Sequence, residues 1–132
     1  EYTQAVQTGM WHVSPQFCLL DFPIEELTGK TLGIVGYGEL GRAVANVAKV
    51  FGMKVLIAQH GSAESTADCL PLTELLTRVD ILSLHCPLTE QTRNIISKPQ
   101  LNLMKPGAIL INTARGGLVD EADRHVGLDV AI

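Results

Sequence analysis

The sequence has little charge and few aromatic residues, and it contains no cluster of Lys or Arg. Charged residues make up 18% of the chain and aromatic residues 5%, with a formal net charge of −4. Proteins that bind the phosphate backbone of a nucleic acid carry a patch of basic residues, and this sequence has no such cluster. No apolar run approaches the roughly 20 residues that a membrane-spanning helix needs, and no signal peptide is recognised. We therefore expect neither nucleic acid nor membrane as a partner.

Cysteine is also scarce. The three cysteines, Cys18, Cys69 and Cys86, are odd in number and widely spaced. No C-x-x-C pair and no paired histidine spacing is present, so we expect no metal site. Widely spaced, unpaired thiols are typical of a reducing compartment, and we expect a cytoplasmic protein.

Apolar residues are plentiful, and they are arranged in alternating strand-like and helix-like segments. The chain has 132 residues and is 46% hydrophobic, which is enough to bury a core without disulfides. Nearly continuous apolar strands that alternate with helices predict a doubly wound parallel sheet with helices on both faces. The expected strands are 31–35, 54–58, 81–85, 108–112 and 127–131, and the expected helices are 40–51, 72–79 and 97–104. Residues 1–30 are expected to form a short helix, broken at Gly9, and an irregular lead-in.

A glycine-rich turn follows the first strand and opens the amphipathic helix after it. Gly36 allows a tight turn, Gly38 allows close approach of a pyrophosphate, and Gly41 allows the helix to pack closely on the strand. The backbone amides of Glu39 and Leu40 are expected to face the phosphates, assisted by the helix dipole. A tight turn without a ligand is the alternative. The strand before it and the helix after it favour a Rossmann-like dinucleotide-binding domain over residues 31–132.

The expected adenosine end of this site carries an amide where many such domains carry an acid. The second strand ends at Gln59 and His60. The amide of Gln59 can bond a ribose hydroxyl, but it lacks the charge that repels a 2′-phosphate. No Arg or Lys lies in residues 59–68, which favours NAD over NADP, although NADP remains possible. His60 is either a cofactor contact or a solvated loop residue, and both interpretations stay open.

Three segments together resemble the D-isomer-specific 2-hydroxyacid dehydrogenases. They are the turn GYGELG (36–41), LHCPLTEQTRNII (84–96) and LMKPGAILINTARGGLVDE (103–121). Residues 14–38 look closest to the glycerate dehydrogenase (hydroxypyruvate reductase) members. The resemblance implies the cofactor domain of an enzyme that transfers a hydride between NAD(P) and a small D-2-hydroxy or 2-oxo acid. It implies a substrate domain outside these residues, and we expect a homodimer.

The resemblance also implies roles for individual residues. Cys86 and Pro87 match a loop beside the adenine and its ribose. Thr113, Ala114 and Arg115 match the loop beneath the nicotinamide, where Arg115 binds the substrate carboxylate and polarises the 2-oxo group as the catalytic arginine. Chemistry supports this role because a guanidinium offers a carboxylate two parallel hydrogen bonds.

The end of the sequence departs from the family pattern. Asp129 matches an aspartate near the nicotinamide carboxamide, but the connection over residues 113–125 is barely long enough for a crossover helix, which leaves the register of Asp129 open. The family's acid–base Glu and His are expected beyond Ile132, and none of the four histidines matches that His; His85 is interpreted as a packed strand residue. We therefore expect these 132 residues alone to be inactive. A non-catalytic dinucleotide-sensing module and an inert structural fragment are the alternatives, and the Arg115 loop favours the enzyme.

Overall fold

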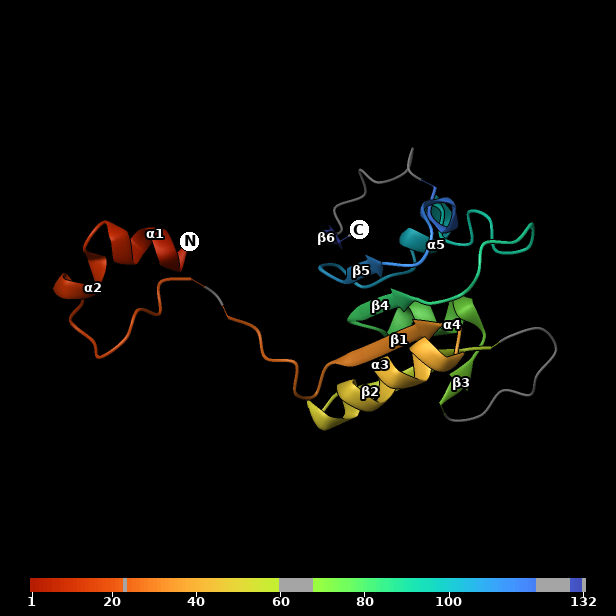
Figure 1. The fold of residues 1–132 in the computed structure, drawn as a ribbon, viewed down its shortest axis with the longest axis horizontal. Coiled ribbons are helices and arrows are strands. Elements are labelled where there is room, and N and C mark those ends of the chain that lie inside the picture. The colour runs from red at the N-terminus through yellow and green to blue at the C-terminus, as the bar shows by residue number, and fades with distance from the viewer. Residues whose placement is uncertain (23, 60–67, 121–128, 132) are drawn as a thin grey trace.

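One parallel sheet organises the chain. The computed structural model describes residues 1–22, 24–59, 68–120 and 129–131. Their six strands lie in the order β3-β2-β1-β4-β5-β6, and every neighbouring pair is parallel (Figure 1). This is the strand order of the doubly wound dinucleotide fold, so the predicted fold class is confirmed. The strands are β1 (Thr31–Val35), β2 (Lys54–Ala58), β3 (Cys69–Leu70), β4 (Ile81–Leu84), β5 (Ile109–Asn112) and β6 (Asp129–Ala131).

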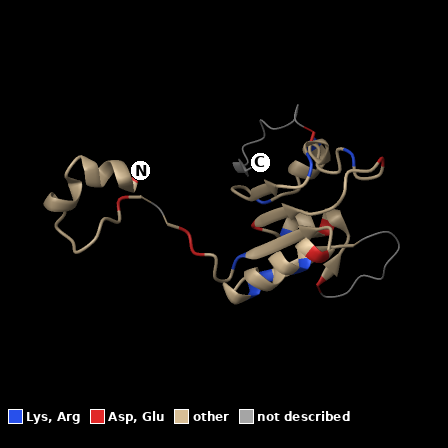
Figure 2. Cartoon of the chain, in the orientation of Figure 1, with Lys and Arg blue, Asp and Glu red and all other residues tan. Residues whose placement is uncertain are grey.

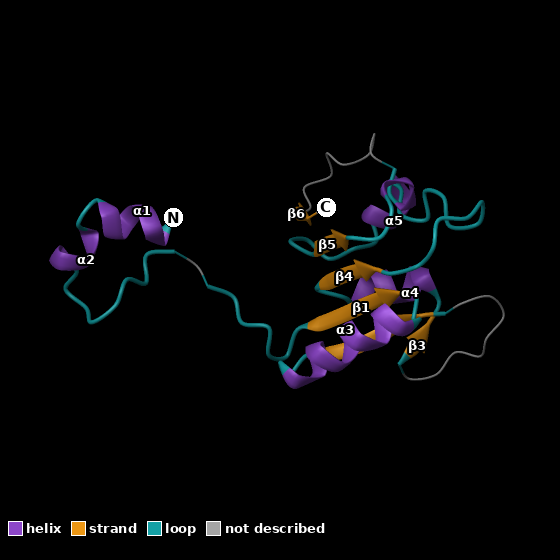
Figure 3. Cartoon of the chain, in the orientation of Figure 1, coloured by secondary structure: helices purple, strands orange, loops and turns teal. Residues whose placement is uncertain are grey.

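Helices connect these strands on both faces of the sheet (Figure 3). The connection from β1 to β2 and the connection from β3 to β4 run in opposite directions along the sheet. Because such crossovers are right-handed, their helices lie on opposite faces. The helices of this part are α3 (Glu39–Val50), α4 (Leu72–Arg78), α5 (Lys98–Leu101) and the 3-10 turn η1 (Gly116–Leu118).

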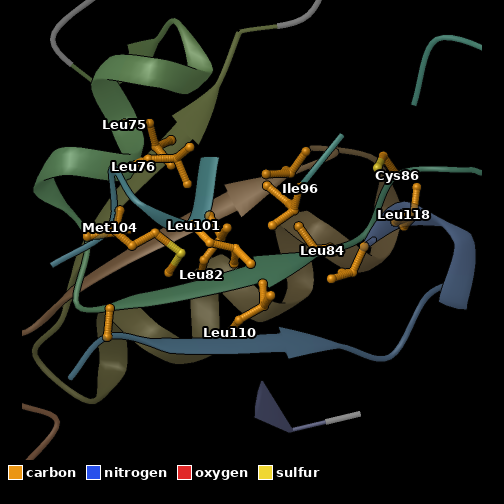
Figure 4. Packing of buried hydrophobic residues seen from close by; sticks show 14 of the residues in the cluster. Leu75, Leu76, Leu82, Leu84, Cys86, Ile96, Leu101, Met104, Leu110 and Leu118 are labelled. Carbon is orange, nitrogen blue, oxygen red and sulfur yellow. The ribbon is translucent and has the colours of Figure 1, made fainter. Parts of the chain in front are cut away.

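Each face of the sheet has its own apolar cluster. The larger cluster joins α4, α5 and η1 to the even-numbered residues of β4 and β5 (Figure 4). Its fully buried side chains include Leu75, Leu76, Leu82, Leu84, Ile96, Leu110 and Leu118. The smaller cluster joins α3 to β1 and consists of Leu32, Ile34, Ala45, Ala48 and Met53. Burial at this scale, at roughly 1.5–3 kcal/mol for each large apolar side chain, is the main force that holds the sheet between its helices.

The N-terminal segment lies apart from the sheet (Figure 1). It forms α1 (Tyr2–Gln7) and α2 (Met10–Val13), which are separated by Gly9 in a left-handed conformation, so the predicted helix break is confirmed. The Tyr2 ring packs edge-on against Phe22 at 4.9 Å, and its hydroxyl donates a hydrogen bond to the carbonyl oxygen of Phe22. A boundary near residue 30 remains a prediction.

Two elements differ from expectation. The two-residue strand β3 was not predicted, because a two-residue edge strand is too short to show a pattern. The helix after Ser97 ends at Leu101 and not at Met104, since residues 102–104 continue in tighter turns. Its start is as expected: Ser97 and Gln100 form a capping box.

The amphipathic helix predicted after the glycine turn, α3, buries its apolar residues only in part. The residues of α3 that pack fully are small ones, namely Gly41, Ala45 and Ala48. Leu40 is 73% exposed, and Val47 and Phe51 are each 56% exposed. The small residues of α3 therefore pack against the sheet and Val44 is partly buried beside them, whereas Leu40, Val47 and Phe51 remain largely exposed.

The amino end of the sheet is held by an ion pair between two loops. The carboxylate of Asp80 accepts a hydrogen bond from the backbone N–H of Thr31 at 2.7 Å and another from Lys105 Nζ at 2.9 Å. Burial by itself would raise the pKa of Asp80, but these hydrogen bonds outweigh it and hold the pKa below its ordinary value. Elsewhere, acidic and basic residues are interspersed over several elements (Figure 2).

Candidate cofactor site

The turn between β1 and α3 requires two of its three glycines for steric reasons. Gly36 has a φ of +97°, and a Cβ there would lie 2.5 Å from the backbone nitrogen of Cys86. A Cβ on Gly41 would collide with the carbonyl oxygen of Gly36. A side chain at either position would therefore push the turn away from β4 or the helix away from the turn.

Gly38 is different, because its surroundings are open. A Cβ on Gly38 would meet no atom within 4 Å, and its φ of −77° suits any residue. Gly38 is the N-cap of α3 and has no side chain that could cap the helix. The first backbone amides of the helix, those of Glu39 and Leu40, therefore receive no hydrogen bond from a capping side chain. Open space in front of uncapped helix amides suits a phosphate group. The geometry of the turn thus fits the pyrophosphate of a dinucleotide.

A cavity of about 480 Å³ lies on the β2 side of this turn. Gln59 and Cys86 both line it, although they are 27 positions apart in the sequence. The backbone N–H of Gln59 donates to the carbonyl oxygen of Leu70 at 2.8 Å, which fixes Gln59 at the end of β2. Thr92 and Ile95 complete the wall opposite β2. This cavity fits the adenosine half of a dinucleotide.

A second cavity, of about 650 Å³, lies on the other side of the turn. The carboxyl ends of β4 and β5 and the first turn of α3 surround it. Its lining residues are Leu40, His85, Cys86, Pro87, Leu88, Thr113, Ala114 and Arg115. Six of the predicted site residues thus converge here, at the point where the strand order reverses. Burial raises the pKa of the Cys86 thiol, which contacts both cavities as a neutral group.

The loop that carries Arg115 is held by a residue that sequence reasoning missed. Asn112, the last residue of β5, is only 4% exposed. Its Oδ1 accepts a hydrogen bond from the N–H of Ala114 at 3.2 Å, and its Nδ2 donates one to the carbonyl oxygen of Arg115 at 2.9 Å. Asn is a residue that bonds nearby backbone in turns, so its place at the end of an apolar strand was the available signal. The Arg115 side chain is exposed and donates to the carbonyl oxygen of Ala114.

Two predicted residues are not brought to these cavities. β6 pairs with β5 so that Asp129 lies beside Ile109, the first residue of β5, whereas the Arg115 loop follows the last. The structure therefore does not bring Asp129 to the nicotinamide side, where the family resemblance had matched it. The sequence reason is the short connection before β6, which left its register weakly specified. His60 lies outside the described residues.

In the part of the chain that the structure describes, the His, Cys, Asp and Glu side chains form no group of three or more that suits a metal ion. None of the helices in this part has the length and apolar character needed to cross a bilayer.

The strand order, the open glycine turn and the paired cavities define a dinucleotide-binding domain. The sequence model for the NAD-binding domain of the D-isomer specific 2-hydroxyacid dehydrogenases matches residues 1–129, and the chain belongs to this family. It is 50% identical over 121 residues to a glycerate dehydrogenase from Methylorubrum extorquens, covering 92% of this chain and 38% of that protein. It is 40% identical over 126 residues to a hydroxypyruvate reductase from Blautia hydrogenotrophica, covering 92% and 39%.

The fold is likewise shared with solved structures. The crystal structure of protein TT0316 from Thermus thermophilus superposes with a TM-score of 0.77 at 37% identity, covering 98% of this chain and 44% of that one. The chain therefore spans well under half the length of these relatives. What it contains is the NAD-binding domain. The glycine turn lies between the two cavities; we call the one lined by Gln59 the adenosine-side cavity, and the one lined by Arg115 the nicotinamide-side cavity.

Proposed function

We propose that this chain is the NAD-binding part of an oxidoreductase that interconverts a small D-2-hydroxy acid and its 2-oxo acid, such as glycerate and hydroxypyruvate. One observation carries the proposal: Arg115 lies in the same cavity as Leu40, the residue at the start of α3. A cation for a carboxylate thus stands next to the place where the nicotinamide half of the cofactor belongs.

The chemistry divides between the cofactor and the protein. Bound NADH supplies the hydride. The guanidinium of Arg115 binds the substrate carboxylate through two parallel hydrogen bonds and polarises the adjacent 2-oxo group. Arg115 is exposed and holds only the carbonyl oxygen of Ala114, so it can turn toward a substrate at small cost. The proton for the new hydroxyl would come from the acid–base Glu and His that the family resemblance implies beyond Ile132.

We also infer that NAD is preferred over NADP. Gln59 occupies the adenosine-side cavity at the end of β2. Residues 59–68 carry no Arg or Lys to bind a 2′-phosphate, and Glu64 and Asp68 add negative charge to this stretch. A 2′-phosphate would therefore meet an uncompensated cost in this region.

Calorimetric titration with NADH and NADPH tests both parts of this proposal. We expect NADH to bind at least tenfold more tightly than NADPH, a difference of about 1.4 kcal/mol. Tighter binding of NADPH would overturn the preference and would assign the 2′-phosphate to His60. Absence of binding to either would leave the inert fragment as the better interpretation. A non-catalytic sensor is not favoured, because the curated relatives of this chain are dehydrogenases and reductases.

We further propose that the whole enzyme is a cytoplasmic homodimer in which a second copy covers the apolar groove beside α3. Beside α3, an almost wholly apolar groove of about 430 Å³ is lined by Val44, Val47, Phe51 and Ile111. An apolar surface of this kind marks an interface, and a twofold axis allows the same patch to pair with itself. Light scattering should show a dimer, and Val47→Asp should convert it to a monomer. The cytoplasmic location rests on the widely spaced cysteines.

A further inference from the structure

Ser83 and His85 form a hydrogen-bonded pair that the proposed function has not used. The Oγ atom of Ser83 lies 2.9 Å from Nε2 of His85. The two residues are two positions apart around the end of β4, so their side chains stand on the same face of the sheet. Ser83 is only 4% exposed and lines the apolar groove beside α3.

Packing alone does not account for a serine at this position. A buried hydroxyl without a hydrogen bond lowers the free energy of unfolding by about 1–3 kcal/mol. Ala or Val would fill this wall of the groove without that cost. Within the described residues, His85 is the hydrogen-bond partner of the Ser83 side chain. The hydrogen bond therefore fixes the orientation of the His85 ring. The backbone of β4 alone would leave that orientation undetermined.

The ring that is fixed in this way belongs to the nicotinamide-side cavity. His85 lines that cavity together with Leu40 and Arg115. Its own backbone N–H donates to the carbonyl oxygen of Val35 at 2.7 Å, so His85 is tied to the residue that precedes the glycine turn. With Nε2 engaged by Ser83, Nδ1 is the ring nitrogen that makes no hydrogen bond within the described part of the chain.

The charge state of the ring suits a hydrogen-bonding role. Burial lowers the pKa of His85 below its ordinary value, so the imidazole is neutral at neutral pH. A neutral imidazole keeps one donor and one acceptor, and the Ser83 hydroxyl can serve either one. Nδ1 is then able to pair with a ribose hydroxyl or a phosphate oxygen without adding charge to the cavity.

We propose that His85 contacts the nicotinamide-nucleotide half of the bound cofactor through Nδ1, and that Ser83 is the positioning residue that holds the ring. This inference rests on the proposed NAD function. It assigns His85 a role in binding in place of the packing role that its strand position suggested.

Three substitutions of His85 distinguish the contribution of Nδ1 to NADH binding from that of Nε2. In His85→Asn the amide lies near the place of Nδ1, in His85→Gln it lies near the place of Nε2, and His85→Leu removes both. We expect the Kd for NADH to rise about tenfold in His85→Leu and His85→Gln, the loss of one good hydrogen bond. His85→Asn should stay within about threefold of the wild type, and Ser83→Ala should show a rise between these values.

Titration of the same variants with AMP is the control, because AMP lacks the nicotinamide half. Its Kd should be unchanged in all four variants, and thermal melts should show that each is folded. Unchanged NADH affinity in His85→Leu and His85→Gln, or an equal loss for AMP, would overturn the inference while leaving NAD binding intact. A wild-type chain that binds neither NADH nor AMP would overturn the proposed function itself, and this inference with it.

Discussion

Asn112 and Arg115 are joined by a hydrogen bond of 2.9 Å from the side-chain amide of the first to the backbone carbonyl of the second. The amide belongs to the last residue of a buried strand, and the carbonyl belongs to the loop that presents the only arginine of the nicotinamide-side cavity within the described residues. The rigid sheet thereby sets the position of a residue that is itself exposed. Through Asn112, the sheet restricts the positions from which Arg115 can bind a substrate carboxylate.

Replacing Asn112 with Ala should therefore destabilise the chain. The substitution leaves the N–H of Ala114 and the carbonyl of Arg115 without their partner, at a cost of about 1–3 kcal/mol in the free energy of unfolding. Urea titration followed by circular dichroism measures this quantity. Asn102→Ala, at an exposed position, is the matched control and should change stability by less than about 0.5 kcal/mol. Equal stability of the two variants would show that the loop does not depend on Asn112.

Gly38→Val should abolish NADH binding and leave the fold intact. The added side chain enters space that is open in the structure and that the pyrophosphate needs. Gly41→Val is the contrasting variant, because its side chain collides with Gly36 and should lower the melting temperature. Calorimetry with NADH and a thermal melt on each variant separate these effects. Normal NADH binding by Gly38→Val would place the phosphates elsewhere.

Arg115→Ala should affect turnover far more than cofactor affinity. In the full-length enzyme we expect kcat/KM for hydroxypyruvate to fall by at least about 10²-fold, as for other charged groups that stabilise a reacting oxygen. The Kd for NADH should stay within about twofold. Arg78→Ala, which removes an exposed partner of Glu74 on α4, is the control for loss of a positive charge. Full activity of Arg115→Ala would remove this residue from the mechanism.

The 132 residues alone should show no measurable reduction of hydroxypyruvate or glyoxylate with NADH. A positioned general acid contributes about 10²–10⁴-fold, and orientation of the substrate and exclusion of water can contribute more. His85, in the nicotinamide-side cavity, is held neutral and engaged with Ser83, so it is a poor proton donor. A sensitive assay of NADH absorbance at high protein concentration checks this. Robust turnover would assign the acid to a histidine of this chain.

Asp80 should make stability depend on pH in the acid range. Its pKa is lower in the folded chain than in the unfolded one, so its carboxylate stabilises the fold fully above its unfolded pKa of about 3.9. This contribution is lost as the pH falls through the folded pKa. We expect Asp80→Asn to cost about 1 kcal/mol at pH 7 and progressively less below pH 4, measured by urea unfolding at each pH. Glu90→Gln, at an exposed loop position, is the control for the loss of one carboxylate.

Local patterns in the sequence determined the fold class and predicted most of the residues that line the two cavities. The run from Thr31 to Val35, the glycine turn and the helix after it are set by contacts near in sequence, so their pattern was sufficient. The convergence of Gln59, Cys86 and the Arg115 loop also followed, because the carboxyl ends of parallel strands meet at one edge of the sheet.

Three features were decided only by the tertiary structure. The side of α3 that is buried depends on which residues fit against β1, and the close approach of helix and strand selected Ala45 over the larger Val47. The position of Asp129 depends on the register of β6, which a pattern of three residues cannot specify. Ser83 and His85 lie on one face of a strand, and their side chains form a hydrogen bond beside a cavity that residues from other segments also line. Each of these depends on packing between segments that are distant in the sequence, and no single segment encodes it.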